Sequence, residues 1–290
     1  EQEQNDQKAI ISSAHNIKIV PKLIYNYNSK ELKVGFKIGI TQMYKLKNLV
    51  EFYDHMINHD KVKYGLKLEF IHTKEAFDDQ SQKLLNFVMK YSEIIKYANE
   101  ASSYYTNFVN NSDIVLSNTG IDEFFDAMAN HEAEYENQYG NQVIKFIDEE
   151  PKIEFQIKNS SDEDFKIITN VDIFNYSIII GKEFVYFLQK NKLYKCSMKF
   201  YRTALRLLEI FKINFTKEIV LKKTEFANLY TLIISEMNAN FTMVDISKDD
   251  LKKYLPKELK VKVFLDVTKS NFVTAAVKFC YDNLEFNPFE

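Results

Sequence analysis

The stretch ELKVGFKIGITQMYKLKNLVEF, residues 31–52, combines two strand patterns, a turn and the start of a helix. Alternating apolar residues in LKVGFKI predict a strand, and MYKLKN predicts a short one after it. Asn48 is expected to cap the following helix, because its side-chain oxygen can accept a hydrogen bond from an unpaired backbone N–H.

Gly35 and Gly39 raise the question of a phosphate-binding loop. Such a loop places its glycines directly before a helix that begins with Lys-Ser or Lys-Thr. Here a strand follows Gly39, and the helix starts only at Asn48. We therefore expect Gly35 to permit a close approach of backbone or a β-bulge, and Gly39 to form a tight hairpin turn.

The rest of the chain alternates short strands with helices. IKIVPKLIY (17–25) is expected to pair with LKVGFKI as a β-hairpin, and VKVFLDV with FVTAAVKFCY as a second hairpin near the end. Apolar residues at helical spacing predict helices over 49–57, 81–97, 122–131, 197–211 and 226–237. No regular strand-helix-strand rhythm appears, so the predicted class is α+β, with largely antiparallel sheets, packed helices and two similar-sized halves. The predicted division is a flexible N-terminal segment 1–16, an N-terminal half 17–145 and a C-terminal half 146–290.

The composition is that of a globular protein, with 46% hydrophobic residues in a chain of 290. No stretch approaches about 18 uncharged apolar residues, and the polar start EQEQNDQ is unlike a signal peptide, so we expect a cytoplasmic protein, with association with the nucleoid as a further option. The polar start without an initiator Met suggests a piece of a longer polypeptide. Cys196 and Cys280 lie far apart in strand-like surroundings, which predicts buried free thiols and no metal knuckle.

Two patterns resemble catalytic motifs, but each lacks a necessary partner. The run VIKFIDEEP (143–151) ends in Asp148-Glu149, as a Mg²⁺-binding strand of a P-loop ATPase does, yet Gly181-Lys182 is followed by Glu instead of Ser or Thr. His55 and His59 have the i, i+4 spacing of two zinc ligands, but Met56 replaces the Glu that would act as base. We predict no catalytic residue and no metal site in this chain.

The strongest pattern is LYKCSMKFYRTALRLLEIF, residues 193–211. Its apolar residues define one buried face of a helix, with Ser197 as the expected cap, namely Phe200, Ala204, Leu207, Leu208 and Phe211. A second set of positions is basic: Lys195, Lys199, Arg202 and Arg206. The two arginines are the only ones in the sequence, and a guanidinium can bind a phosphate or carboxylate through two parallel hydrogen bonds. These four residues are the predicted nucleic-acid contacts.

The charge distribution leaves a second interpretation open. Residues 181–262 hold 15 Lys, two Arg and nine acidic residues, whereas residues 121–164 hold 13 acidic residues and three Lys. A basic region inside an acidic protein is typical of a polyanion partner. The same basic residues could instead form a solvated face or an internal contact with the acidic segment 121–164.

Four segments in this order resemble the helicase-associated domain of bacterial Swi/Snf-type ATPases. They are ELKVGFKIGITQMYKLKNLVEF, VKYGLKLEFIHTKEAFDDQSQKLLNFV, LYKCSMKFY and KVFLDVTKSNFVTAAVKFCYDNLEFNPF, and they extend over most of the chain. Members of that family carry a zinc finger before this domain and two RecA-like ATPase lobes after it. This sequence contains no Cys-x-Cys pair and no Gly-Lys-Thr loop, so the resemblance provides no catalytic residue to transfer.

The resemblance implies a non-catalytic accessory domain of an ATP-dependent DNA helicase or translocase. Its expected partners are DNA or RNA and the ATPase lobes of the parent protein, with no membrane partner and the oligomeric state left open. No cofactor is expected in this segment, because ATP and Mg²⁺ would bind in the motor. The alternative function is a protein-interaction or autoinhibitory scaffold that uses the acidic segment 121–164.

Overall fold

The computed structural model describes residues 16–58, 61–64, 68–71, 73–102, 111–222, 225, 241–244, 260–267, 273–281 and 284–286. The described chain forms two compact units. Unit 1 consists of residues 1–151 and 174–202, and unit 2 of residues 152–173 and 203–290. The class is α+β, as predicted, and most strand pairs are antiparallel. The predicted segment 1–16 and the predicted helix 226–237 lie almost entirely outside the described residues.

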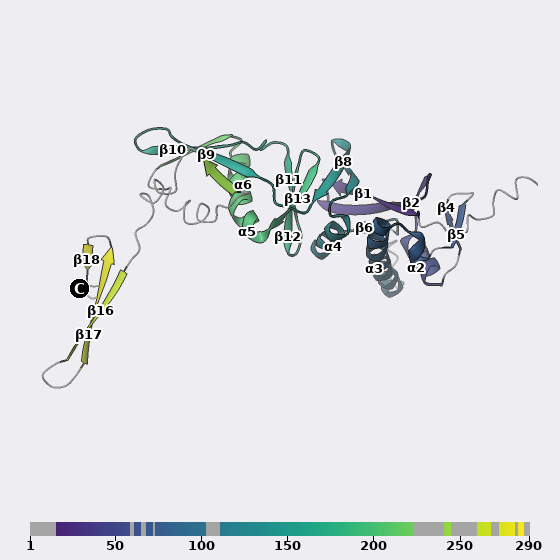
Figure 1. The fold of residues 1–290 in the computed structure, drawn as a ribbon, viewed down its shortest axis with the longest axis horizontal. Helices are drawn as coiled ribbons and strands as arrows, with labels where there is room; N and C mark the ends of the chain where they lie inside the picture. Colours follow the sequence, from purple (N-terminus) through teal and green to yellow (C-terminus); the bar gives the residue numbers. More distant parts are fainter. Residues whose placement is uncertain are drawn as a thin grey trace, which may run out of the picture. The chain divides into compact units, whose positions relative to one another are not determined.

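A nine-stranded sheet organises unit 1 (Figure 1). Its strands are β1 (Lys18–Asn26), β2 (Glu31–Gly39), β3 (Met43–Lys45), β6 (Asp113–Val115), β7 (Glu132–Asn137), β8 (Gly140–Ile147), β11 (Tyr176–Ile180), β12 (Phe184–Gln189) and β13 (Lys192–Ser197). The strand order is β11-β12-β13-β8-β7-β1-β2-β3, with β6 also paired to β2. The pairs β1 with β7 and β13 with β8 are parallel, and the others are antiparallel.

The β1–β2 hairpin confirms the prediction for the N-terminal strands. Its register runs from the pair Lys18 and Gly39 to the pair Asn26 and Glu31. A Cβ atom on Gly39 would lie 2.0 Å from the carbonyl oxygen of Gln42, so only glycine fits this turn. A Cβ on Gly35 would lie 2.5 Å from Oδ1 of the Asp113 side chain in β6, whereas the nearest backbone atom, the Ser112 carbonyl oxygen, would be 4.0 Å away, so the neighbour of Gly35 is a side chain and not the expected backbone.

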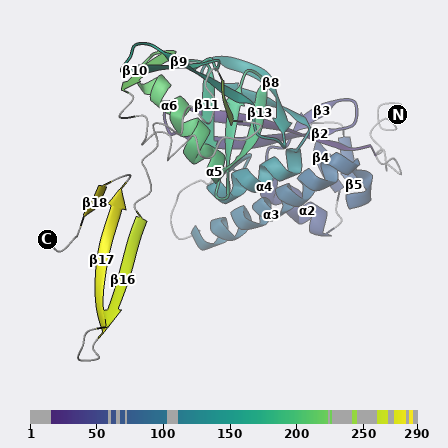
Figure 2. The same cartoon turned by 60° about the vertical axis from the view of Figure 1, so that its left-hand side comes forward.

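Three helices lie side by side on one face of this sheet: α2 (Leu49–Asn58), α3 (Asp79–Ser102) and α4 (Asn118–Met128) (Figure 2). Asn48 caps α2, as predicted, by accepting a hydrogen bond from the Glu51 N–H at 3.1 Å. The predicted helix 122–131 is displaced toward the N-terminus, because Ser117 caps α4 by accepting from the Gly120 N–H at 3.0 Å. Residues after Met128 turn into β7. A 3₁₀ turn, η1 (Lys74–Ala76), and the hairpin of β4 (Lys61–Tyr64) and β5 (Leu68–Ile71) complete unit 1.

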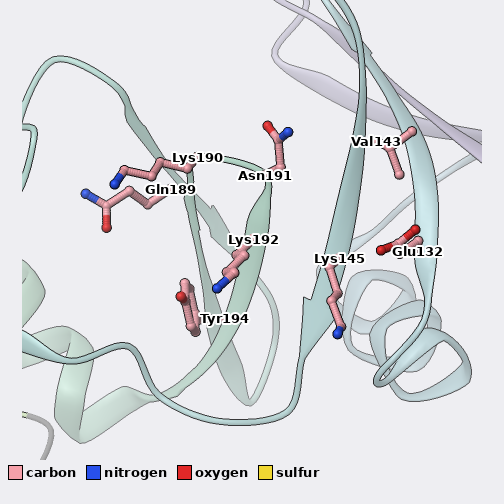
Figure 3. A pocket seen from close by; sticks show the side chains of 8 residues that line it. All are labelled: Glu132, Val143, Lys145, Gln189, Lys190, Asn191, Lys192 and Tyr194. Atoms are coloured by element: carbon pink, nitrogen blue, oxygen red, sulfur yellow. The ribbon is translucent and has the colours of Figure 1, made fainter.

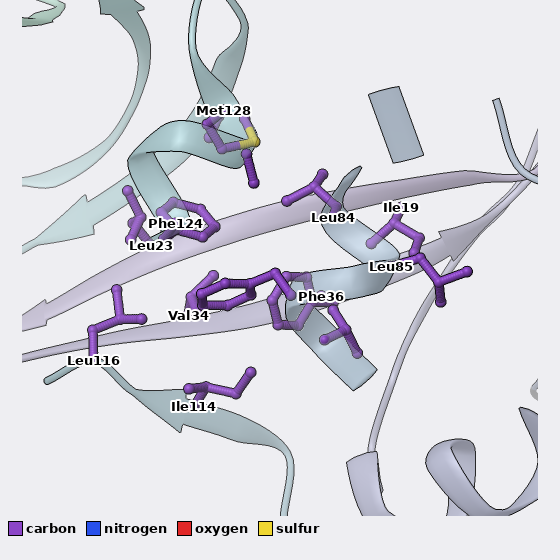
Figure 4. Close-up of a cluster of buried hydrophobic side chains, with 14 of the residues drawn as sticks. Ile19, Leu23, Val34, Phe36, Leu84, Leu85, Ile114, Leu116, Phe124 and Met128 are labelled. Carbon is purple, nitrogen blue, oxygen red and sulfur yellow. The ribbon is translucent and has the colours of Figure 1, made fainter. Parts of the chain in front are cut away.

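The core of unit 1 lies between this helical layer and the sheet (Figure 4). Inward-facing residues of β1, β2 and β6 meet apolar residues of α3 and α4, including Ile19, Leu23, Val34, Phe36, Leu84, Leu85, Ile114, Leu116, Phe124 and Met128. The ring centroid of Phe87 lies 6.4 Å from that of Phe36 and 5.4 Å from that of Phe124. This packing holds α4 in place, and the same helix carries Asp122 and Asp126, which contact the β11–β13 segment.

Unit 2 contains a smaller sheet, a helix and a hairpin. The sheet has the order β14-β10-β9-β15, formed by β14 (Glu218–Lys222), β10 (Asp164–Thr169), β9 (Ile153–Asn159) and β15 (Phe241–Val244). The helix α6 (Arg206–Ile213) packs Phe211 against Phe155 of β9, with ring centroids 5.8 Å apart. The predicted C-terminal hairpin is confirmed as β16 (Lys260–Val267) with β17 (Val273–Tyr281), and β18 (Leu284–Phe286) adds a third strand.

Candidate nucleic-acid interface

Lys195 faces carboxylates of the protein itself. It lies in β13, and its Nζ is 3.2 Å from Oδ1 of Asp126 in α4 and 3.7 Å from Oδ1 of Asp148. The ammonium also lies 4.2 Å from the ring centroid of Phe184, and only 18% of the side chain is exposed. Lys195 therefore makes an internal contact with the acidic segment 121–164, which the sequence left open as the alternative to a phosphate contact. Its charge is already balanced.

Asp122, one turn before Asp126, fixes the neighbouring turn between β11 and β12. Its Oδ2 accepts hydrogen bonds from the N–H groups of Lys182 and Glu183 at 2.9 and 2.8 Å. Its Oδ1 accepts from the Tyr186 hydroxyl at 2.7 Å. A Cβ on Gly181 would lie 2.0 Å from this carboxylate, so the Gly-Lys pair serves this contact and does not form a phosphate loop.

Burial keeps the Tyr186 hydroxyl protonated. Desolvation, and then its hydrogen bond to Asp122, raise the pKa of Tyr186 far above that of a free tyrosine. The sequence interpretation recognised the acidic segment but did not single out Asp122 or Tyr186. The only available signal was Asp122 at the start of a helical pattern, which favours capping equally well.

Lys199, Arg202 and Arg206 are exposed on one helical run. The run comprises α5 (Met198–Phe200), a π-helical turn η2 (Tyr201–Leu205) and α6. Ser197 caps it as predicted, by accepting from the Phe200 N–H at 3.1 Å. Ser197 is held in turn by Glu150, whose Oε1 accepts from the Ser197 N–H and hydroxyl at 3.1 and 2.8 Å.

The predicted buried face of this run is confirmed, with Phe200, Ala204, Leu207, Leu208 and Phe211 each at most 3% exposed. The three consecutive residues Thr203, Ala204 and Leu205 are also buried, which a regular α-helix with one apolar face would not achieve. The π turn at these positions accounts for the wider buried face. Such turns insert a residue into a helix and occur often at functional sites.

A second basic feature lies on unit 1, where β8 meets the turn between β12 and β13 (Figure 3). It is an open groove of about 780 Å³, lined by Glu132, Val143, Lys145, Gln189, Lys190, Asn191, Lys192 and Tyr194. The sequence interpretation did not identify this groove. Its lining comes from segments whose proximity depends on the parallel pairing of β8 with β13, which local patterns do not predict.

The remaining chemical candidates do not assemble into a site in the described residues. Nε2 of His55 lies 3.5 Å from Glu51, and His59 is outside the described residues. No group of three or more described His, Cys, Asp or Glu side chains is arranged to hold a metal ion. Cys196 is a buried free thiol, as predicted, and burial raises its pKa. None of the described helices is both long enough and apolar enough to cross a membrane.

Comparison with known families gave one match. The family model described as bacterial SNF2 helicase associated matches residues 112–290, which is more than half of the chain. The matched range includes α4, the strands of the groove and the helical run with Arg202 and Arg206. No curated protein sequence and no solved structure matched the chain.

Proposed function

The chain belongs to the family of bacterial SNF2 helicase-associated domains, and from this premise we propose that it is a non-catalytic accessory domain that couples an SNF2-type ATP-dependent motor to nucleic acid. ATP and Mg²⁺ would bind in the motor of the parent protein. In this proposal Lys199, Arg202 and Arg206 contact phosphates. Lys195 is not one of the contacts, because its ammonium already faces Asp126 and Asp148.

The observation that supports this proposal best is the exposure of the only two arginines of the sequence, together with Lys199, on one helical run. Arginine presents a planar fork that matches a phosphate, and it stays charged at any physiological pH. Buried apolar residues anchor the run within each unit, Phe200 in unit 1 and Leu207, Leu208 and Phe211 in unit 2. Contacts with phosphates fix a protein on the nucleic-acid backbone without reading its sequence.

A triple variant tests these residues: Lys199→Gln, Arg202→Gln and Arg206→Gln. Duplex binding is measured by fluorescence anisotropy over a range of salt concentrations. Each lost phosphate contact should reduce the slope of log K against log salt by about 0.9, so the triple variant should lose roughly 2.7. A matched control replaces the exposed Lys18, Lys45 and Lys47 with Gln and should keep the slope within about one contact. An unchanged slope in the triple variant, or no duplex binding by the wild type even at low salt, refutes the proposal.

The alternative function, a scaffold that uses the acidic segment 121–164, makes a different prediction. Several of its carboxylates have partners within the chain, including Asp122, Asp126 and Glu150. Exposed acidic residues such as Glu149 and Glu163 would then have to bind a basic partner. Neutralising these two should change ATPase stimulation in the parent protein without altering duplex binding by this chain.

A further inference from the structure

The floor of the groove is a row of side chains that crosses four adjacent strands. Gln189 of β12 pairs with Lys192 of β13, Lys192 pairs with Lys145 of β8, and Lys145 pairs with Glu132 of β7. Paired residues on neighbouring strands project from the same face of a sheet. The next row, with Leu188, Leu193, Phe146 and a neighbouring Ile144, is buried in the core. The row with the lysines therefore projects from the face opposite the core.

This row places two lysines, Lys145 and Lys192, at directly paired positions of adjacent strands. Adjacent strands are about 4.8 Å apart, so the backbones of Lys145 and Lys192 are separated by about this distance. Like charges at directly paired positions repel each other. Among the described residues, none forms an ion pair with either lysine, although Glu132 occupies the next position in the row. An anion bound between the two ammonium groups would remove the repulsion.

The turn beside this row adds a third lysine, Lys190, and a second amide, Asn191. Lys190 has φ 47°, a left-handed conformation that glycine or asparagine usually adopts, and it is exposed at the lip of the groove. Gln189 and Asn191, on either side of it, provide amide donors and acceptors. The Asn191 carbonyl accepts from the Lys145 N–H at 2.9 Å, which ties the turn to β8. The lip therefore has a defined position relative to the floor.

Tyr194 adds an aromatic ring to the groove, which a binding site for a small anion would not need. It lies two residues after Lys192 on the same strand, so both side chains are on one face of β13, and both line the groove (Figure 3). Its ring is half-buried, and this burial raises the pKa of its hydroxyl, so the ring remains uncharged at neutral pH. An aromatic ring beside lysines is the arrangement by which proteins bind single strands, because an unpaired base can stack on the ring while phosphates meet the basic groups.

We propose that this groove binds a single strand of nucleic acid, with Lys145, Lys190 and Lys192 contacting phosphates and Tyr194 stacking on a base. The inference rests on the proposed function and assigns a second contact, separate in sequence from the helical run. A duplex satisfies the lysines but keeps its bases paired, away from Tyr194. An acidic peptide satisfies the lysines and does not need the ring.

The test uses the 290-residue chain, a fluorescent oligothymidine, the corresponding duplex and polyglutamate as probes. The groove variant combines Lys145→Gln with Lys192→Gln and should reduce the single-strand salt slope by about 1.4, since each lost contact contributes about 0.7. Tyr194→Ala should weaken oligothymidine binding roughly 5- to 150-fold, and Tyr194→Phe, which keeps the ring, should bind as the wild type does. The double replacement of Lys18 and Lys45 by Gln is the matched control, because both are exposed lysines of the same sheet.

The outcomes separate this inference from the proposed function. If the groove variant and Tyr194→Ala bind oligothymidine as the wild type does, while the triple variant of the helical run loses duplex binding, the groove inference is refuted and the proposed function stands. If the groove variant loses only oligothymidine binding while the triple variant keeps its duplex slope, the groove stands and the helical assignment fails. Equal loss of oligothymidine and polyglutamate binding, with no effect of Tyr194→Ala, would show a general anion site and overturn the inference. A thermal unfolding curve for each variant confirms that it is folded.

Discussion

Replacing Lys195 with Met should lower stability and leave nucleic-acid binding intact. Methionine keeps most of the apolar stem that packs beside Phe184 but removes the ammonium. The ion pairs with Asp126 and Asp148 involve side chains that are 68% and 51% exposed, so each contributes at most about 1 kcal/mol. The cation–π contact at 4.2 Å from the Phe184 centroid adds about 0.5–1 kcal/mol. We expect a total loss of about 1–2 kcal/mol.

Two measurements on the Lys195→Met protein check this reasoning. Thermal unfolding should shift down by roughly 2–8 °C, the range expected for about 1–2 kcal/mol in a domain of this size. The salt slope for duplex binding should not change, because Lys195 already faces two carboxylates. A second variant, Asp126→Asn, should be destabilised by a smaller amount, and the double variant should lose less than the sum of the two.

The result that would refute the reasoning is a loss of about 0.9 in the salt slope for Lys195→Met, the value expected for one phosphate contact. Lys195 would then exchange Asp126 and Asp148 for nucleic acid in solution. It would have to be restored to the interface beside Lys199, Arg202 and Arg206. The salt slope is measured on folded protein, so a variant that loses binding because it unfolds would not be mistaken for one that has lost a phosphate contact.

Three further perturbations follow from contacts of unit 1. Asp122→Ala should lower the free energy of unfolding by about 2–3 kcal/mol, because it leaves the buried Tyr186 hydroxyl without its acceptor. In a double-mutant cycle measured by urea unfolding, Asp122→Ala and Tyr186→Phe should show a coupling energy of about 1 kcal/mol. Strictly additive losses would contradict the contact between the two side chains. Burial, and then the neighbouring Glu123 carboxylate, raise the pKa of Tyr91 to about 12 from 10.0, so its protonated hydroxyl stabilises the fold fully below about pH 10 and loses this effect as the pH rises toward 12. Tyr91→Phe should therefore reduce the alkaline fall of the urea midpoint, and an identical fall in both proteins would argue against this contact. Gly39→Ala should destabilise by about 2–3 kcal/mol, since its Cβ would lie 2.0 Å from a backbone carbonyl oxygen, and a melting temperature equal to that of the wild type would be inconsistent with this turn.

Local patterns in the sequence predicted most individual elements. The β1–β2 hairpin, the Asn48 cap and the buried face around Leu207 and Leu208 follow from alternation, capping chemistry and helical spacing, which depend only on near neighbours. The strands β7 and β14 were missed, because EAEYEN and EIVLK are short and rich in charge. The α+β class could be predicted from the sequence because it depends on the types and order of helices and strands and not on which strands pair.

Tertiary pairings were not within reach of the sequence. The parallel pair of β8 with β13 brings Lys145 beside Lys192, and no local signal marks two segments so far apart as neighbours. Lys195 was grouped with the helical run because its spacing to Lys199 is four residues. The structure places it in β13, where strand alternation directs it toward Asp126, whereas Arg202 lies in the helical run. The helix was predicted to start after Ser197, as it does, but charge spacing grouped Lys195 with the basic positions of that helix although Lys195 lies in the strand before it.

The interleaving of the two units has a consequence for synthesis of the protein. During translation β8 is made before β13. The strands β9 and β10, which belong to unit 2, are made between these two strands of unit 1. Until residues 174–197 have been made, β8 is an edge strand of the growing sheet, and Tyr186 and Leu193 are missing from the core. Exposed edges of this kind promote pairing with other chains. Cells that make this protein must therefore hold an unfinished sheet in solution while its last strands are translated, and any shortened version that ends near Pro151 would keep that edge open permanently.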